Sequence, residues 1–427
     1  MKQVPALLLA TALLGAPADA QEGTPIIAVP PLATTDDQPT SAGSTRSIAW
    51  QATQLIVSDL QSSSEVMALP PDQQRDFYSY PEVTAPTFSR WRAKGAKALI
   101  TGFVQARSDG RITVGCYVYD AEKGRELGRT GFVVAPTDWR RAAHKCSGLA
   151  YQSLTGAPGT FDTRIAYVAE LGTPAAPVSR IAVMDSDGQH HTYVTPTGIT
   201  VLSPRLSPRA DRVAYVSYAS GKPQVWVSGV GGGSQRPLLA NDLMSFAPRF
   251  SPDGRRIAFA MQSGPNIDIY VADAGGGVVQ RLTTSPGIDT SPSFSPDGTK
   301  ILFESDRSGT QQLYVMEITG ANQRRLSFGG GWYGSPEWSP DGDKIAFTRR
   351  GTGIGFMNSD GSGERLLTRG TRDDGPSWAA SSRELIFQRP EAAGRHGIYR
   401  VTLGGGQPRR VQTPGPGTDP DWSGVLD

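Results

Sequence analysis

Six short segments of this sequence share one pattern of proline, an apolar residue and serine, and this pattern decides the fold. They are Pro204-Arg-Leu-Ser207, Pro248-Arg-Phe-Ser251, Pro292-Ser-Phe-Ser295, Pro336-Glu-Trp-Ser339, Pro376-Ser-Trp-Ala379 and Pro420-Asp-Trp-Ser423. Successive prolines lie 44, 44, 44, 40 and 44 residues apart. A fixed period of this length is typical of the four-stranded blades of a propeller and not of helical pairs.

The residues that follow these segments have the composition of hairpins. Three copies continue into Ser-Pro-Asp-Gly, at 251–254, 295–298 and 339–342. Proline presets φ at the second position of a turn, and glycine adopts the left-handed conformation that closes a hairpin. An apolar strand such as Ile257-Ala-Phe follows each turn, and two further strand types recur six times. The pattern therefore predicts six blades of four strands.

The two ends of the repeat indicate a closed ring. The first complete strand, Ile165-Ala-Tyr-Val168, has no proline segment before it, and nothing follows the last segment, Pro420 to Ser423. If the last strand pairs with the first blade, no strand edge is left exposed. The alternative, a linear β-solenoid, would need capping repeats at both ends. We expect a six-bladed β-propeller over residues 161–427, with the C-terminal strand closing the first blade.

The N-terminal residues 1–20 have the features of a signal peptide. Lys2 precedes a short apolar stretch, and Ala18-Asp19-Ala20 fits the pattern that a signal peptidase cuts. The alternative is a hydrophobic N-terminal core helix. No second apolar run approaches the roughly 20 residues that span a bilayer. We therefore expect a periplasmic protein without membrane insertion.

Residues 21–160 predict a small α/β domain. Strands are expected at 25–29, 98–104, 112–119 and 126–133, with helices at 47–60 and 138–154. Strand alternation places Cys116 on one face of the sheet, and helical periodicity places Cys146 on the stripe that faces this sheet. In an oxidising compartment, two cysteines in this arrangement predict a disulfide. Two separate buried thiols are the alternative.

Composition and motifs exclude several classes of function. The net charge is +2 and no basic block occurs, so nucleic acid is not an expected partner. Two cysteines and four histidines leave little material for a metal site. Neither Gly-x-Ser-x-Gly nor His-Glu-x-x-His occurs. Gly329, Gly331 and Gly334 match a dinucleotide fingerprint only formally, because a strand follows instead of a helix. We expect no catalysis, no cofactor and no metal.

The loops that lead into the first strand of each blade are the candidate binding surface. They should ring the mouth of the central channel, and we call them the mouth loops: 200–203, 243–247, 287–291, 331–335, 371–375 and 417–419. They carry Met244, Phe246, Trp332 and Tyr333 among polar residues. Exposed aromatic and methionine side chains are typical of protein interfaces. The alternative is that some of these aromatic rings pack over neighbouring blades.

The chain resembles the TolB family of the Tol–Pal envelope system. The junction Leu154-Thr-Gly-x-x-Gly-x-Phe161-Asp-Thr-Arg-Ile-Ala-Tyr-Val-Ala-Glu170 carries the resemblance, together with Phe88-Ser-x-Trp91-Arg, Gly95-Ala-x-Ala98-Leu and Asp138-Trp-Arg-Arg141-x-Ala-His144. The similarity covers nearly the whole mature chain. It implies a monomeric propeller that binds the lipoprotein Pal at its channel mouth and supports outer-membrane integrity and constriction during division.

The resemblance also assigns residues to partners. Family positions that match Met244, Ala247 and Thr290 belong to the Pal contact. Together with the mouth-loop analysis, the candidate Pal-binding residues are Met244, Ser245, Phe246, Ala247, Asp289, Thr290, Trp332, Tyr333, Gly334, Asp374, Thr418 and Asp419. Family members engage TolA through a longer N-terminal arm. Cleavage after Ala20 would leave only Gln21, Glu22, Gly23 and Thr24 for that contact.

Two other classes of function are alternatives to protein binding. A propeller hydrolase would need a second domain of a few hundred residues with a serine elbow, and only about 130 residues lie outside the repeat and the predicted signal peptide. A propeller that binds a sugar or another small ligand would use Trp332 and Tyr333 as stacking platforms. Ligand-dependent shifts of the melting temperature would distinguish it from a protein-binding propeller.

Overall fold

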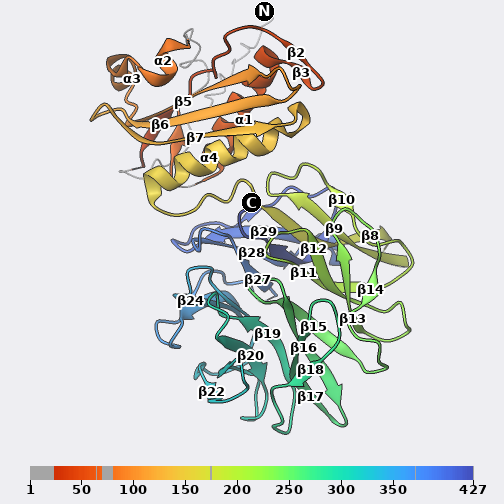
Figure 1. Ribbon diagram of the computed structural model, residues 1–427. Coiled ribbons are helices and arrows are strands. Elements are labelled where there is room, and N and C mark those ends of the chain that lie inside the picture. Colours follow the sequence, from red (N-terminus) through yellow and green to blue (C-terminus); the bar gives the residue numbers. More distant parts are fainter. Residues whose placement is uncertain (1–23, 64, 70–79, 174–175, 371, 427) are drawn as a thin grey trace, which may run out of the picture. The chain divides into compact units, whose positions relative to one another are not determined.

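The computed structural model describes residues 24–63, 65–69, 80–173, 176–370 and 372–426 (Figure 1). The chain divides into two compact units, residues 1–143 and 144–427. The predicted signal peptide and three residues of the short arm, Gln21, Glu22 and Gly23, lie outside the described residues, whereas Thr24 is half-buried. No helix within the described ranges is long and apolar enough to cross a membrane.

The N-terminal unit contains a five-stranded sheet in the order β4-β1-β5-β6-β7. Its strands are β1 (Ile26–Ala28), β4 (Met67–Ala68), β5 (Ala98–Ala106), β6 (Ile112–Asp120) and β7 (Arg125–Val134). β1 pairs in parallel with β4 and β5, and β5, β6 and β7 form an antiparallel meander. A small hairpin joins β2 (Pro39–Thr40) to β3 (Gly43–Ser44). The predicted mixed α/β domain is confirmed.

The described residues contain four α-helices and two short 3-10 turns. They are α1 (Thr45–Ser62), α2 (Pro81–Thr84), α3 (Phe88–Ala93), η2 (Pro136–Asp138), α4 (Trp139–Thr155) and, in the propeller, η3 (Ala392–Gly394). Ser44 caps α1 by accepting a hydrogen bond from the Ser47 N–H, as serine commonly does at this position. The buried face of α1 includes Ile48, Ala52 and Ile56, as the sequence periodicity predicted.

A disulfide joins β6 to α4. Both cysteines of the chain are bonded, Cys116 in β6 to Cys146 in α4, and both side chains are buried. The predicted pairing is therefore confirmed.

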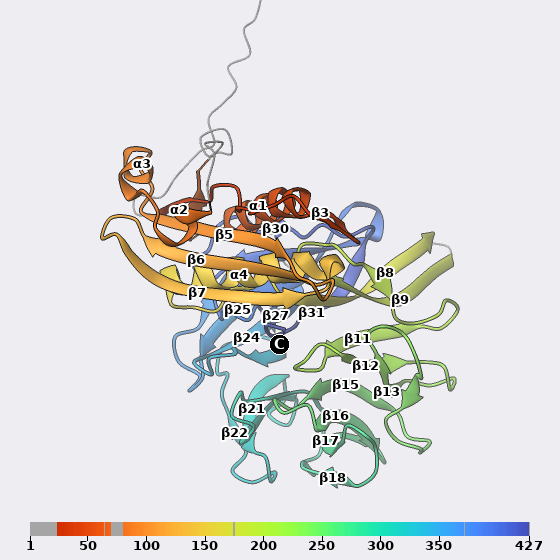
Figure 2. The same cartoon turned by 45° about the horizontal axis from the view of Figure 1, so that its top comes forward.

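The C-terminal unit is a propeller of six four-stranded sheets, which follow one another in chain order around a common centre (Figures 1 and 2). Blade 1 contains β8 (Arg164–Thr173), β9 (Ala176–Asp185), β10 (Thr192–Tyr193) and β31 (Gly417–Trp422). Blade 2 contains β11 (Val201–Leu206), β12 (Arg212–Ser217), β13 (Gln224–Gly229) and β14 (Arg236–Pro237). Blade 3 contains β15 (Ser245–Phe250), β16 (Arg256–Ser263), β17 (Asn266–Asp273) and β18 (Val279–Arg281).

The remaining blades repeat this arrangement. Blade 4 contains β19 (Asp289–Phe294), β20 (Lys300–Ser305), β21 (Gln312–Glu317) and β22 (Arg324–Arg325). Blade 5 contains β23 (Tyr333–Trp338), β24 (Lys344–Arg349), β25 (Gly353–Asn358) and β26 (Arg365–Leu366). Blade 6 contains β27 (Asp374–Trp378), β28 (Glu384–Pro390), β29 (His396–Thr402) and β30 (Arg409–Arg410).

The C-terminal strand closes the ring as predicted. β31 pairs antiparallel with β8, with Trp422 opposite Ile165. The indole Nε1 of Trp422 donates to Thr163 Oγ1 at 2.8 Å, and the Ser423 N–H donates to the Arg164 carbonyl at 2.9 Å. Closure pairs the edge of β8, which would otherwise be open to strand addition.

The core of the propeller lies between neighbouring blades. Side chains from each pair of adjacent sheets form an apolar cluster, and the last cluster joins Ile386 and Ile398 of blade 6 to Tyr167 and Trp422 of blade 1. Each blade is therefore stabilised mainly by its neighbours, so the stability of the ring depends on its closure.

Deleting residues 417–427 should lower the melting temperature and reduce the cooperativity of unfolding, because it removes β31 and exposes apolar surface on blades 1 and 6. Calorimetry on the truncated protein tests this expectation. A synthetic peptide of residues 417–427, added in excess, should restore part of the loss. A truncated protein with an unchanged melting curve would contradict closure as a source of stability.

Removing the disulfide by the double change Cys116→Ala and Cys146→Ala should lower the free energy of unfolding by about 3–4 kcal/mol, because the bond restricts the unfolded chain. Urea denaturation measures this difference. Wild-type protein unfolded in the presence of a reductant is the matched control and should resemble the double variant. Equal stability of the oxidised and reduced wild-type proteins would contradict the expectation.

Candidate functional site

Each inner strand of the propeller contains a bulge at its repeat proline. The pairing register shifts there in all six blades. The residue before each proline has a positive φ of 47° to 63°; these residues are Ser203, Ala247, Ser291, Ser335, Gly375 and Asp419. Because proline has no N–H, the bulge leaves only the amide of the preceding residue outside the ladder.

These bulge amides form hydrogen bonds between blades. Four of them donate to a side chain of the preceding blade: Ser335 N to Glu304 Oε1 (2.9 Å), Gly375 N to Thr348 Oγ1 (3.2 Å), Asp419 N to Gln388 Oε1 (2.7 Å) and Ser203 N to Asp419 Oδ2 (2.9 Å). These side chains connect blade 4 to blade 5, blade 5 to blade 6, blade 6 to blade 1 and blade 1 to blade 2.

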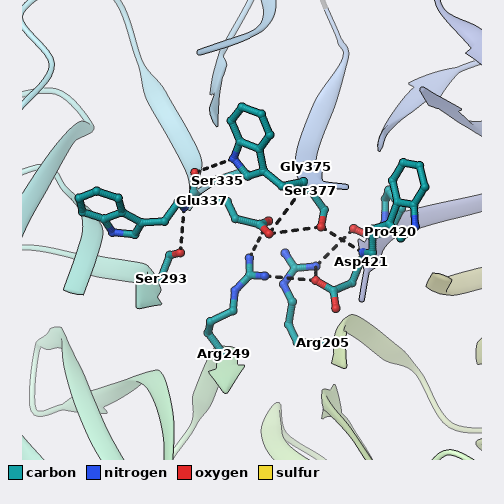
Figure 3. Close-up of polar contacts among 12 residues, drawn as sticks. Arg205, Arg249, Ser293, Ser335, Glu337, Gly375, Ser377, Pro420 and Asp421 are labelled. Carbon is teal, nitrogen blue, oxygen red and sulfur yellow. Dashed lines mark hydrogen bonds and ion pairs between the residues drawn. The ribbon is translucent and has the colours of Figure 1, made fainter. Parts of the chain in front are cut away.

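The residues directly after the prolines form a second ring, whose side chains converge between the blades (Figure 3). They are Arg205, Arg249, Ser293, Glu337, Ser377 and Asp421. Four of them accept an N–H of the next blade: Asp421 Oδ2 from Leu206 N (2.7 Å), Ser293 Oγ from Trp338 N (3.3 Å), Glu337 Oε1 from Trp378 N (3.5 Å) and Ser377 Oγ from Trp422 N (3.1 Å). Arginine has no acceptor, so Arg205 and Arg249 cannot do this.

Arg249 instead bridges the two carboxylates of this ring. Its Nη1 lies 3.1 Å from Asp421 Oδ1 and its Nη2 lies 3.2 Å from Glu337 Oε2 (Figure 3). Burial raises the pKa of Glu337, and the charge of Arg249 opposes this shift. These six residues were not selected as site residues from the sequence, although each of them follows a repeat proline in the six quoted segments. Four of these six residues are charged, which is unusual for a position facing the centre of a fold.

Five predicted site residues line one pocket at the mouth. Thr290, Trp332, Tyr333, Gly334 and Asp374 surround a cavity of about 340 Å³ between blades 4 and 5. Glu304 lies in the same wall, and burial raises the pKa of its carboxyl group. The structure therefore brings together residues from three blades that the sequence separates widely.

The two neighbouring aromatic residues of this pocket differ in exposure. Trp332 is 49% exposed, and the Arg350 guanidinium lies 5.1 Å from the centre of its ring. Tyr333 is 1% exposed, and its hydroxyl donates to Glu364 Oε2 at 2.7 Å. The expectation that Tyr333 presents its ring at the surface is wrong, because β23 begins at this residue and directs the ring into the interface with blade 4.

Several other predicted residues hold the loops together. Ser245 is buried and accepts the Val225 N–H at 2.9 Å. Asp289 is buried and its Oδ2 lies 2.7 Å from Arg307 Nη2. Asp374 accepts hydrogen bonds from Thr348 Oγ1 (2.7 Å) and from Ser335 Oγ (3.2 Å).

The remaining predicted residues are partly accessible. Phe246 is half-buried and packs against the cluster between blades 3 and 4. Six further predicted residues are half-buried as well: Met244, Ala247, Thr290, Gly334, Thr418 and Asp419. Sequence reasoning did not select Leu202 (37% exposed), Leu243 (44%) and Ile288 (42%), although all three lie in mouth loops and are exposed apolar residues. Within the described ranges, no group of three or more His, Cys, Asp or Glu side chains is placed to hold a metal ion.

The change Arg249→Met should lower the free energy of unfolding by about 3 kcal/mol, because Glu337 and Asp421 lose their shared cation in a buried site. The loss should be greatest near neutral pH. Without Arg249 the pKa of Glu337 in the folded state lies further above its value in the unfolded chain. The stability of the variant therefore falls as the pH rises from the unfolded to the folded pKa of Glu337. Chemical denaturation at pH 5 and pH 7.5 measures both effects. Equal losses at the two pH values would contradict this account.

Comparison with known proteins identifies the family. Residues 151–426 match the TolB beta propeller domain, and residues 19–127 match the TolB amino-terminal domain. The chain is 56% identical over 405 residues to the Tol-Pal system protein TolB of Zymomonas mobilis, covering 94% of this chain and 88% of the relative. It is 52% identical over 431 residues to the Tol-Pal system protein TolB of Rhizorhabdus wittichii, covering 98% of both.

A solved structure agrees with these matches. The crystal structure of TolB from Acinetobacter baumannii superimposes with a TM-score of 0.79 at 27% identity, covering 95% of this chain and 98% of that chain. The two domains, the closed ring and the sequence identities lead to one conclusion: the chain belongs to the TolB family, the non-enzymatic periplasmic proteins of the Tol–Pal system.

Proposed function

We propose that this protein binds the lipoprotein Pal at the channel mouth, through the mouth loops. The observation that carries the proposal is the exposure of large apolar side chains on four successive mouth loops: Leu202 (37%), Leu243 (44%), Ile288 (42%) and Trp332 (49%). Large apolar side chains exposed on neighbouring loops are typical of protein-binding surfaces. Membership of the TolB family makes Pal the expected partner for this surface.

The opposite face of the propeller supports the same choice. Its Ser-Pro-Asp-Gly turns use their polar groups for their own closure. Ser251 Oγ donates to Asp253 Oδ1 at 2.6 Å, and the Arg255 N–H donates to the same oxygen at 3.0 Å. Hydrogen bonds from Ser251 and Arg255 hold the pKa of Asp253 below its usual range. These side chains are occupied within the turns, so they offer little to a partner.

The proposal includes the cellular role that follows from binding Pal. A periplasmic protein that binds an outer-membrane lipoprotein can support outer-membrane integrity and constriction during division. Contact with TolA through the N-terminal arm is not part of the proposal. Of the arm, only Thr24 lies within the described residues, and it is half-buried.

The change Trp332→Ala should weaken Pal binding about thirtyfold, because a central, partly exposed aromatic side chain typically contributes about 2 kcal/mol to an interface. Isothermal titration calorimetry with purified Pal of the same bacterium measures this effect. The change Asp297→Lys on the opposite face is the control, and binding should stay within about threefold. A large loss for Asp297→Lys with no loss for Trp332→Ala would place the Pal site on the turn face.

A further inference from the structure

The hydrogen bonds made by the bulge amides do not run all the way round the mouth. Glu304, Thr348 and Gln388 occupy one equivalent position of the second strand in blades 4, 5 and 6, and each accepts the bulge amide of the next blade. In blades 2 and 3 this position is held by Val216 and Ala260. Neither side chain has an acceptor atom, so the amides of Ala247 and Ser291 have no partner there.

Backbone geometry directs the Ala247 amide toward this same interface. Ser245, two residues earlier, donates its N–H to the Pro223 carbonyl of blade 2 at 3.0 Å, away from β16. Amides two residues apart on a strand face the same side. The φ of Ala247 is 47°, close to the 48° of Ser335, whose amide does reach the preceding blade. Within the described part of the chain, no side chain accepts the amide of Ala247 or of Ser291.

The mouth loops around these two amides also carry exposed apolar residues. Leu202, Leu243 and Ile288, all more than a third exposed, belong to the mouth loops of blades 2, 3 and 4. The bulge amides of blades 6 and 1, by contrast, have acceptors in Thr348 Oγ1 and Gln388 Oε1. We call the mouth loops of blades 2 to 4 the open arc.

We infer that the amides of Ala247 and Ser291 are hydrogen-bond donors that take up carbonyl or carboxylate oxygens of Pal on the open arc. This inference rests on the proposed function. A partner that covers the open arc removes water from both amides, so binding is favourable only if the partner supplies acceptors. The open arc therefore selects a Pal segment that carries oxygen acceptors between apolar side chains. The bulge amides of blades 5, 6, 1 and 2 are already bonded to side chains of the preceding blades and contribute none.

Amide-resolved hydrogen exchange, followed by NMR on the full mature protein, tests the inference directly. In the free protein, the amides of Ala247 and Ser291 should exchange at least about tenfold faster than those of Ser203, Ser335 and Asp419, which have acceptors. Saturating Pal should slow Ala247 and Ser291 by at least the same factor. The three satisfied amides are internal controls for general stabilisation.

A pair of matched variants provides the second test. Val216→Thr copies Thr348 and supplies an acceptor for the Ala247 amide, whereas Val168→Thr makes the same change at the equivalent position of blade 1. The amide that Val168 would face, that of Ser203, is already bonded to Asp419. Val216→Thr should weaken Pal binding about fivefold, the equivalent of one net hydrogen bond, and Val168→Thr should leave it within about twofold.

The outcomes separate this inference from the proposed function. Slow exchange of Ala247 and Ser291 in the free protein overturns the inference while Pal binding stands. The inference is also overturned if Pal leaves the exchange rates of these two amides unchanged, or if Val216→Thr and Val168→Thr affect Pal binding equally. If Pal does not bind the unsubstituted protein, the proposed function is wrong, and both amides lose this role with it.

Discussion

A left-handed residue followed by proline, repeated once in every inner strand, is the constraint on which the centre of this propeller depends. For a residue with a side chain this conformation costs roughly 1–2 kcal/mol, and only one of the six positions is glycine. Such strain persists where the surrounding structure requires it. Here it turns an amide out of the blade and toward its neighbour, so that backbone and side chains of adjacent blades are joined at the mouth.

The residue after each proline directs its side chain toward those of the other blades, and the six blades differ at this position. Four of these side chains accept an amide of the next blade, while Arg249 holds Glu337 and Asp421 together. Buried ion pairs contribute little net stability, because desolvation offsets their attraction. Their consequence is that the blades are not interchangeable: each inner strand has polar partners that only particular strands provide.

Variation between blades is also where function is expected. The apolar clusters between blades and the hairpin turns recur with little change, and their side chains are occupied by packing or by turn closure. The mouth loops differ from blade to blade in both exposure and hydrogen bonding. Blades 4 to 6 satisfy their neighbours' amides with side chains, whereas blades 2 and 3 present valine and alanine at the same position. Where a blade lacks the side-chain acceptor, a bound partner can supply one.

The sequence by itself determined the architecture of this protein. The proline period gave the number of blades, the unpaired ends of the repeat gave their closure, and alternation placed Cys116 and Cys146 where they could bond. It also located the mouth loops, because antiparallel order decides which loops share a face. Local pattern is sufficient for these features, since each depends on the backbone geometry of one repeating unit or on a single periodicity.

Only the tertiary structure decided which side chains are available at the mouth. In a regular strand, successive side chains point to opposite faces of the sheet. A bulge shifts this alternation by one residue. The sequence pattern therefore could not tell which faces the residues on either side of each proline occupy. Tyr333 was expected in an exposed loop, but it is the first residue of β23 and is buried, while its neighbour Trp332 is exposed. The ring of Arg249, Glu337 and Asp421 joins positions up to 172 residues apart. Such contacts exist only when the ring has closed.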